Sequence, residues 1–175
     1  MSLTGIFSRI FAVLSFGLAL GLLPTVAQAA SVEGSWLTSN GAEITVSPCA
    51  DGYCGVLSWI VIPKSQAELC LSLPKEEFAP LILDYNNADK SQQTRSLLGA
   101  QMLKLKPTND PDAYTASIYN AEDGSTHDVL VWITEGGNNF RLGGGCLGSL
   151  CAVTQDWPRV PLREVTPDFT CEGGV

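Results

Sequence analysis

Six cysteines constrain this chain more than any other feature, because all of them follow an apolar N-terminal segment and four fall into two Cys-x4-Cys pairs. They are Cys49, Cys54, Cys70, Cys146, Cys151 and Cys171. An even number of cysteines in an exported chain favours disulfide bonds over a metal site. Asp51-Gly52 is a strong two-residue hairpin turn, and folding about it sets Cys49 opposite Cys54, at a separation that a disulfide can bridge. The same register pairs Val46 with Leu57 and Ile44 with Trp59, so apolar residues share one face.

The second pair repeats this arrangement about the turn Gly148-Ser149. Cys146 then faces Cys151, and the register extends backward to set Phe140 opposite Trp157. A third turn at Gly136-Gly137 adds another strand in the same register and sets Ile133 opposite Phe140. Cys70 and Cys171 are left for each other by elimination, without local geometry to support the pairing.

The N-terminus has the order of an export signal. Arg9 precedes an apolar stretch over 10–26, and the small-residue sequence Ala27-Gln28-Ala29 follows it. We expect residues 1–29 to be a signal peptide that is cleaved after Ala29, with an uncleaved anchor as the alternative. The protein would then be periplasmic or secreted, with no membrane span after cleavage, and the remaining length suits one domain.

Charge narrows the class of partner. The chain has 10 basic and 18 acidic residues, a net charge of −8, and the expected signal peptide contains only one of the basic residues. An acidic surface repels phosphate backbones, so nucleic acid is excluded as the expected partner. The negative charge of the chain does not exclude neutral or cationic ligands.

Short segments rich in β-branched and aromatic residues, separated by turn sequences, predict an all-β barrel or sandwich. The expected strands are 32–38, 42–48, 53–62, 80–83, 101–106, 113–119, 127–134, 139–145 and 151–157. A short helix is expected over 88–98, and the Pro-punctuated stretch 63–80 is expected to be a long loop that holds Cys70. The barrel domain would span 30–160, and 161–175 would be an irregular surface tail tethered by Cys171.

Six sequence motifs occur in an order typical of one bacterial family. They are Gly34-Ser35-Trp36, the hairpin 49–54 with Gly55 and Trp59, Asp84-Tyr85-Asn86-Asn87, Arg95-Ser96-Leu97-Leu98-Gly99, the run 118–124 and the run 154–160. Over about 33–160 the chain therefore resembles the bacterial domain-of-unknown-function 2147 family. The resemblance implies an exported, lipocalin-like antiparallel β-barrel, of eight or nine strands with one short helix and disulfide staples, without an established activity.

The resemblance also implies how the barrel is closed. Gly34-x-Trp36 is similar to the first-strand motif of lipocalin-type barrels, in which the Trp packs at the closed end beneath an Arg from the last strand. Arg159 is the matching residue here. An ordinary core Trp with an exposed Arg is the alternative.

Asp84, Asn87 and Arg95 form the polar set of greatest interest. Asp and Asn favour turns by bonding to nearby backbone groups, and Arg95 could pair with Asp84 to fix a cap on the barrel. Alternatively, this loop lies at the open end and presents polar groups to a ligand. In that case Trp59 and Tyr119 are the aromatic candidates for the same binding site.

Catalysis and cofactors have little support in the sequence. His127 is the sole histidine, which excludes a histidine metal cluster, and its neighbour Asp128 points to the opposite face of a strand. A Gly-rich phosphate loop and a Cys-x-x-Cys motif are both absent, so we expect no cofactor and no metal. The sequence therefore favours a protein that binds a small apolar or amphipathic molecule. An inhibitor or envelope-interaction module with a filled barrel is the alternative, and a carboxylate-based hydrolase is third.

Overall fold

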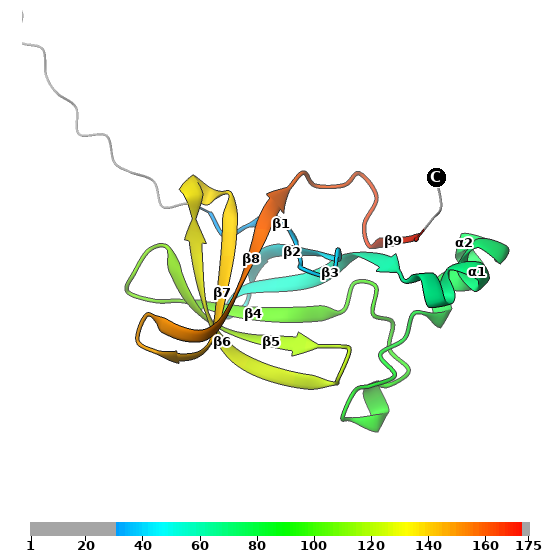
Figure 1. Ribbon diagram of the computed structural model, residues 1–175, viewed down its shortest axis with the longest axis horizontal. Coiled ribbons are helices and arrows are strands. Elements are labelled where there is room, and N and C mark those ends of the chain that lie inside the picture. The colour runs from blue at the N-terminus through cyan, green and yellow to red at the C-terminus, as the bar shows by residue number, and fades with distance from the viewer. Residues whose placement is uncertain (1–30, 173–175) are drawn as a thin grey trace, which may run out of the picture.

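The computed structural model describes residues 31–172, so the expected signal peptide, 1–29, lies outside the described residues. The described part contains a closed barrel of eight antiparallel strands with one further strand on its edge (Figure 1). Consecutive strands are neighbours from β3 to β8, and the pairings of β1 with β8 and with β2 and of β2 with β3 close the barrel. The strands are β1 (Gly34–Leu37), β2 (Glu43–Cys49), β3 (Gly52–Ile62), β4 (Gln101–Pro107), β5 (Ala113–Asn120), β6 (Ser125–Thr134), β7 (Asn139–Leu147), β8 (Leu150–Val160) and β9 (Asp168–Cys171).

The β7–β8 hairpin confirms the predicted register. Cys146 pairs with Cys151 and Phe140 with Trp157, and β6 adds the pairing of Ile133 with Phe140. The hairpin curls, and in Figure 1 its tip lies at the lower left, away from the helices. A Cβ at Gly143 would lie 2.4 Å from the Cys151 sulfur, so the curl needs glycine at this position.

The register predicted for the β2–β3 hairpin is wrong by two residues. Cys49 pairs with Gly52 and Ile44 pairs with Leu57, so Cys54 lies diagonally across from Cys49. Gly52 is needed for a different reason than the one assumed: its φ is 133°, and a Cβ there would lie 2.3 Å from the Leu105 carbonyl oxygen. Glycine therefore allows β4 to approach, while Ala50 and Asp51 make the turn.

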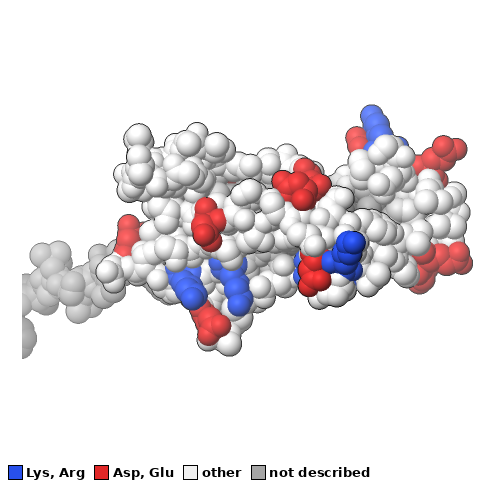
Figure 2. Space-filling view, turned by 90° about the horizontal axis from the view of Figure 1, so that it is seen from below, with Lys and Arg blue, Asp and Glu red and all other residues white. Residues whose placement is uncertain are grey.

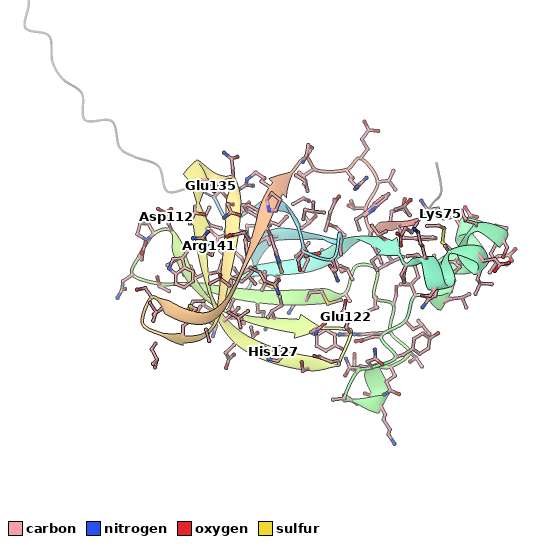
Figure 3. All side chains as sticks on the ribbon, in the orientation of Figure 1. Lys75, Asp112, Glu122, His127, Glu135 and Arg141 are labelled. Atoms are coloured by element: carbon pink, nitrogen blue, oxygen red, sulfur yellow. A yellow bond between two sulfur atoms is a disulfide. The ribbon has the colours of Figure 1, made fainter. Side chains whose placement is uncertain are left out.

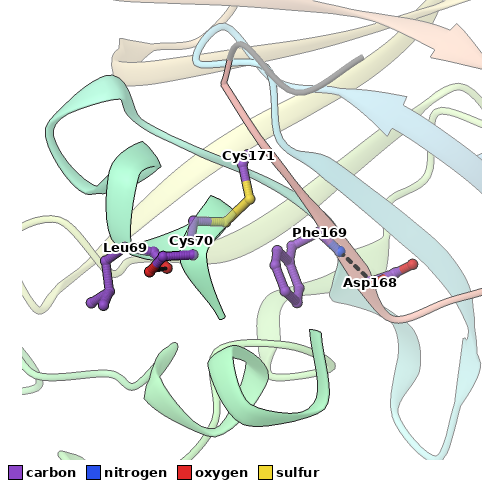
Figure 4. The surroundings of a disulfide bond; sticks show 6 residues. Leu69, Cys70, Asp168, Phe169 and Cys171 are labelled. Carbon is purple, nitrogen blue, oxygen red and sulfur yellow. Dashed lines mark hydrogen bonds between the residues drawn. A yellow bond between two sulfur atoms is a disulfide. The ribbon is translucent and has the colours of Figure 1, made fainter. Parts of the chain in front are cut away.

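The three disulfides join the predicted pairs. Cys49–Cys54 and Cys146–Cys151 each connect residues five apart within one hairpin. Cys70–Cys171 connects residues 101 apart and ties a helix to β9 (Figure 4). Two of the bridges therefore fix local hairpins, whereas the third links distant parts of the chain.

The closed end of the barrel is filled by aromatic side chains. The ring of Phe140 stacks on Trp157 at 5.4 Å and contacts Trp36, which is fully buried. The Arg159 guanidinium lies 4.0 Å from the centroid of the Trp36 ring and donates to backbone oxygens of Ser31, Glu33 and Gly137. Such a cation–π contact contributes roughly 0.5 to 2 kcal/mol. The Trp36–Arg159 contact implied by the family resemblance is present.

Several predictions for the connections are wrong. The expected loop 63–80 forms α1 (Lys64–Ser72) and α2 (Lys75–Phe78), each starting directly after a proline, and a 3-10 turn, η1 (Ala79–Leu81), replaces the expected strand 80–83. Of the expected helix 88–98, only the 3-10 turn η2 (Lys90–Gln92) forms. The expected irregular tail contains β9, which pairs in parallel with the end of β3. A further 3-10 turn, η3 (Glu135–Gly137), joins β6 to β7. None of the described helices is long and apolar enough to cross a membrane.

Candidate functional site

A cavity of about 810 Å³ opens at the end of the barrel opposite the Trp36–Arg159 contact. Trp157 contributes to its inner wall, and apolar side chains from β2, β3, β4 and β5 form its sides. These side chains include Ile44, Leu57, Met102 and Ile118. The interior is therefore packed at one end and open at the other.

The segment 63–97, which we call the cap, covers part of this opening. Phe78 and Ile82 of the cap are buried and line the cavity. The Phe78 ring lies 5.4 Å from that of Phe169 in β9. Phe169 lies near the Cys70–Cys171 disulfide (Figure 4). The cap is thereby held to the barrel edge on one side.

The turn between β5 and β6 holds the other side of the cap. The side-chain amide of Asn86 donates to the carbonyl oxygens of Ala121 and Glu122, at 3.2 and 3.0 Å. A Cβ at Gly124 would lie 1.9 Å from the Asn86 carbonyl oxygen, so this turn requires glycine there for close approach to the cap.

Asp84 is the centre of the polar network inside the cap. Its side chain is fully buried and accepts hydrogen bonds from Tyr119 Oη at 2.6 Å, Asn87 Nδ2 at 2.7 Å and Arg95 Nε at 2.8 Å. Burial alone would raise the pKa of Asp84, but the bonds from Tyr119, Asn87 and Arg95 outweigh burial and hold the pKa below its ordinary value. Burial and the bond to Asp84 raise the pKa of Tyr119. Asp84 is therefore ionised in the folded protein at neutral pH.

Residues 34–159 match the sequence profile of DUF2147, described as "Uncharacterized protein conserved in bacteria". The chain belongs to the DUF2147 family. Among solved structures, this DUF2147 protein is similar to one described as "Protein HP1028 from the human pathogen Helicobacter pylori belongs to the lipocalin family". The two share 17% identity with a TM-score of 0.52, over 75% of this chain and 84% of the other. This likeness shows a lipocalin-like fold. No curated protein sequence matches the chain.

Of the five residues predicted to bind a ligand in this DUF2147 protein, Tyr119 alone lines the cavity. Asp84, Asn87 and Arg95 lie together on the far side of the Tyr119 side chain, with the Arg95 guanidinium 5.2 Å from the centroid of its ring. The structure thus brings four of the five together in one network.

Trp59 is separate from that network. A register shift between Glu43 and Ile44 pairs Glu43 with Trp59, and the Trp59 ring lies 3.6 Å below the guanidinium of Arg163. Arg163 also donates to both carboxylate oxygens of Glu43, which is buried. Trp59 is not among the residues that line the cavity.

Several cavity residues of the DUF2147 protein were not singled out from the sequence. Met102 and Ile118 follow the alternation of their strands and could have been found from it, whereas Phe78 and Ile82 belong to segments expected to be a loop and a strand. Their contribution depends on the way the cap folds back over the opening, which no local pattern signals.

The sole histidine contacts a serine on the same strand. His127 Nε2 lies 2.7 Å from Ser125 Oγ, and Ser125 Oγ donates to Asp123 Oδ1. Asp123 therefore bonds to the serine and not to the histidine, which is a different order from a Ser-His-Asp triad. Hydrogen bonds from Ser125 hold the pKa of the Asp123 carboxyl below its usual range. Asp123 lies in the β5–β6 turn, and Ser125 and His127 lie at the start of β6.

A second hollow of about 710 Å³ lies on the outer surface between β4, β5, β6 and the curled β7–β8 hairpin. Lys104 and Lys106 line it together with Asp51 and Asp128, so it offers both signs of charge. The hairpin tip beside it exposes Leu147 and Leu150, at 87% and 80%. This hollow lies outside the barrel and belongs to no network described above.

Proposed function

We propose that this protein binds a small apolar or amphipathic molecule in the cavity at the open end of the barrel, and that it does so without turnover. The observation that carries this proposal is the cavity itself, whose volume of about 810 Å³ is in the usual range for ligand sites. Its deeper walls are apolar, while amide and hydroxyl groups of Thr38, Asn40, Asn120 and Gln155 lie among its lining. This combination suits a ligand with an apolar body and a polar end.

Filling the cavity should abolish ligand binding without unfolding the protein. Ile118 lines the cavity from β5, so Ile118→Trp should occupy space that the ligand needs. The matched control is Thr115→Trp, on the same strand but exposed at the outer surface. Titration with the apolar fluorescent probe N-phenyl-1-naphthylamine should show saturable binding to the wild type and to Thr115→Trp, and a loss of about tenfold or more in affinity for Ile118→Trp. Equal probe affinity in the two variants would contradict binding in the cavity.

The alternative, a protein-interaction module with a filled barrel, is less well supported. The packed aromatic cluster occupies only the closed end, and the cavity remains at the other. A hydrolase of the Ser-His-Asp type is also less well supported, because Asp123, Ser125 and His127 are exposed or half-buried at a surface turn and lack the order of a triad.

We further propose that the protein acts outside the cytoplasm, in the periplasm or as a secreted protein. Three disulfides support an oxidising compartment, and the order of charged, apolar and small residues in 1–29 supports export. Mass spectrometry of the protein recovered from the native envelope or medium should identify Ala30 as the first residue. Recovery of the full-length mass would contradict cleavage.

A further inference from the structure

We infer that the ligand is an amphiphile whose polar head is neutral or positively charged, with Glu122 at the rim as its charged contact. This inference rests on the proposed function, because it concerns the ligand of the same cavity. It goes beyond that function by excluding fatty acids and other anionic amphiphiles. The volume of the cavity and the polarity of its lining would not by themselves exclude these ligands.

The first support is the charge of the cavity lining. Among the described residues that line the cavity, Glu122 is the only charged one, and none is Lys, Arg or His. A carboxylate or phosphate head would have to leave water without a cation to receive it, which is unfavourable. An alcohol, an ester or an amine does not meet this obstacle.

The second support is that two cations of the cap, Arg95 and Lys75, already have carboxylate partners. The Arg95 guanidinium, which contacts the ring of the lining residue Tyr119, is paired with the buried carboxylate of Asp84 at 2.8 Å. Lys75, directly before the acidic pair Glu76 and Glu77, is paired with Asp168 at 2.5 Å. Moving either cation toward a ligand would break an existing pair, and in the first case would leave a buried charge alone.

The third support is the surface charge at this end of the molecule. Acidic side chains gather at the end that carries the helices of the cap (Figure 2). Glu68, Glu76 and Glu77 are all exposed on α1 and α2. Lys64 and Lys75 lie on the same helices, but the chain as a whole has a net charge of −8, which slows the approach of an anionic ligand and favours a cationic one.

Glu122 is placed to contact the head group. It lies in the β5–β6 turn, on the side of the barrel nearer the cap (Figure 3). Its Oε1 accepts from Asn40 Nδ2 at 3.2 Å, across the opening between the β1–β2 loop and the β5–β6 turn. Among the described residues no donor contacts Oε2, so this oxygen can accept from a hydroxyl or an ammonium group.

A series of ligands with one alkyl chain and different heads tests the inference. Decanol, decylamine and decanoate, each below its micelle concentration at pH 8, are used to displace N-phenyl-1-naphthylamine from the wild type. We expect decanol and decylamine to displace the probe at least about tenfold more effectively than decanoate, because only decanoate brings an unpaired negative charge. Glu122→Lys should raise the affinity for decanoate and lower that for decylamine. The control Glu76→Lys removes an exposed carboxylate outside the cavity lining and should change both much less.

The outcomes separate this inference from the proposed function. If decanoate binds as tightly as decanol, the head-group inference is wrong while ligand binding stands. If Glu76→Lys changes the order of the ligands as much as Glu122→Lys does, the contact at Glu122 is wrong. If neither the probe nor any of the three ligands binds the wild type, the proposed function fails, and the inference fails with it.

Discussion

Replacing both Cys70 and Cys171 with serine should lower the free energy of unfolding by about 4 kcal/mol, the largest effect expected of the three disulfides. The reason is the length of the chain that the bridge encloses, because its ends are 101 residues apart. A cross-link over a long loop removes more conformational entropy from the unfolded chain than one over a short loop. Urea denaturation of the oxidised wild type and of the double variant measures the difference.

The matched control is the double variant Cys49→Ser and Cys54→Ser. Its bridge connects residues only five apart, within a hairpin that backbone pairing already holds, so the loss should be about 2 kcal/mol or less. The Cys70 and Cys171 variant should also weaken probe binding, because Cys70 holds α1 to β9 beside the cavity residue Phe78. Equal losses of stability in the two double variants would contradict the argument from loop length.

Asp84→Ala should cost about 3 kcal/mol of stability, because it removes the common acceptor of a buried network. Tyr119, Asn87 and Arg95 would each lose a hydrogen bond, and the charge of Arg95 would lose its partner. The control is Arg141→Ala, which breaks a bidentate pair with Asp156 that is about half exposed and leaves the bond from Asn139 to Asp156 in place. Exposed pairs contribute about 0 to 1 kcal/mol, so the control should lose much less. Similar losses in the two variants would show that the network is not a main support of the cap.

The same network predicts how stability depends on pH. The folded-state pKa of Asp84 lies below its ordinary value of 3.8, so the folded state holds the ionised form more strongly than the unfolded state does. Ionised Asp84 therefore contributes to the free energy of unfolding. This contribution is complete above the unfolded-state pKa of Asp84 and is lost as the pH falls through its lower, folded-state pKa. Asp84→Asn removes the titrating group, so its free energy of unfolding should fall less steeply below about pH 4 than that of the wild type. Parallel curves for the two proteins would contradict a lowered pKa.

The barrel could be predicted from the sequence because its strands pair with their neighbours and its turns are local. The Gly148-Ser149 and Gly136-Gly137 turns set the register of β6, β7 and β8 directly. The Asp51-Gly52 turn misled the prediction, because Gly52 serves the close approach of β4 and not the turn itself. A contact between distant segments decided that register, and no short-range pattern reveals such a contact.

The cap and β9 could not be predicted for the same reason. β9 has only four residues and pairs in parallel with a strand more than 100 residues earlier. Its formation as a strand therefore depends on pairing with β3 and on the disulfide to Cys70. α1 shows only Ala67 and Cys70 on its buried side, too short a pattern to separate a helix from a loop. The polar loop was predicted to contain an interacting Asp and Arg, and they interact. Which side of Tyr119 they occupy depends on the fold of the cap.

The connectivity of the cysteines also bears on how the protein acquires its bridges. The chain is synthesised from its N-terminus, so Cys70 emerges after Cys49 and Cys54 and long before Cys146, Cys151 and Cys171. Closing a loop of five residues is entropically easier than closing one of 101, so we expect each hairpin pair to oxidise before the distant pair does. Only two thiols then remain when the last segment arrives. We therefore expect the hairpin bridges to limit wrong pairings during oxidation, and the long bridge to need little reshuffling.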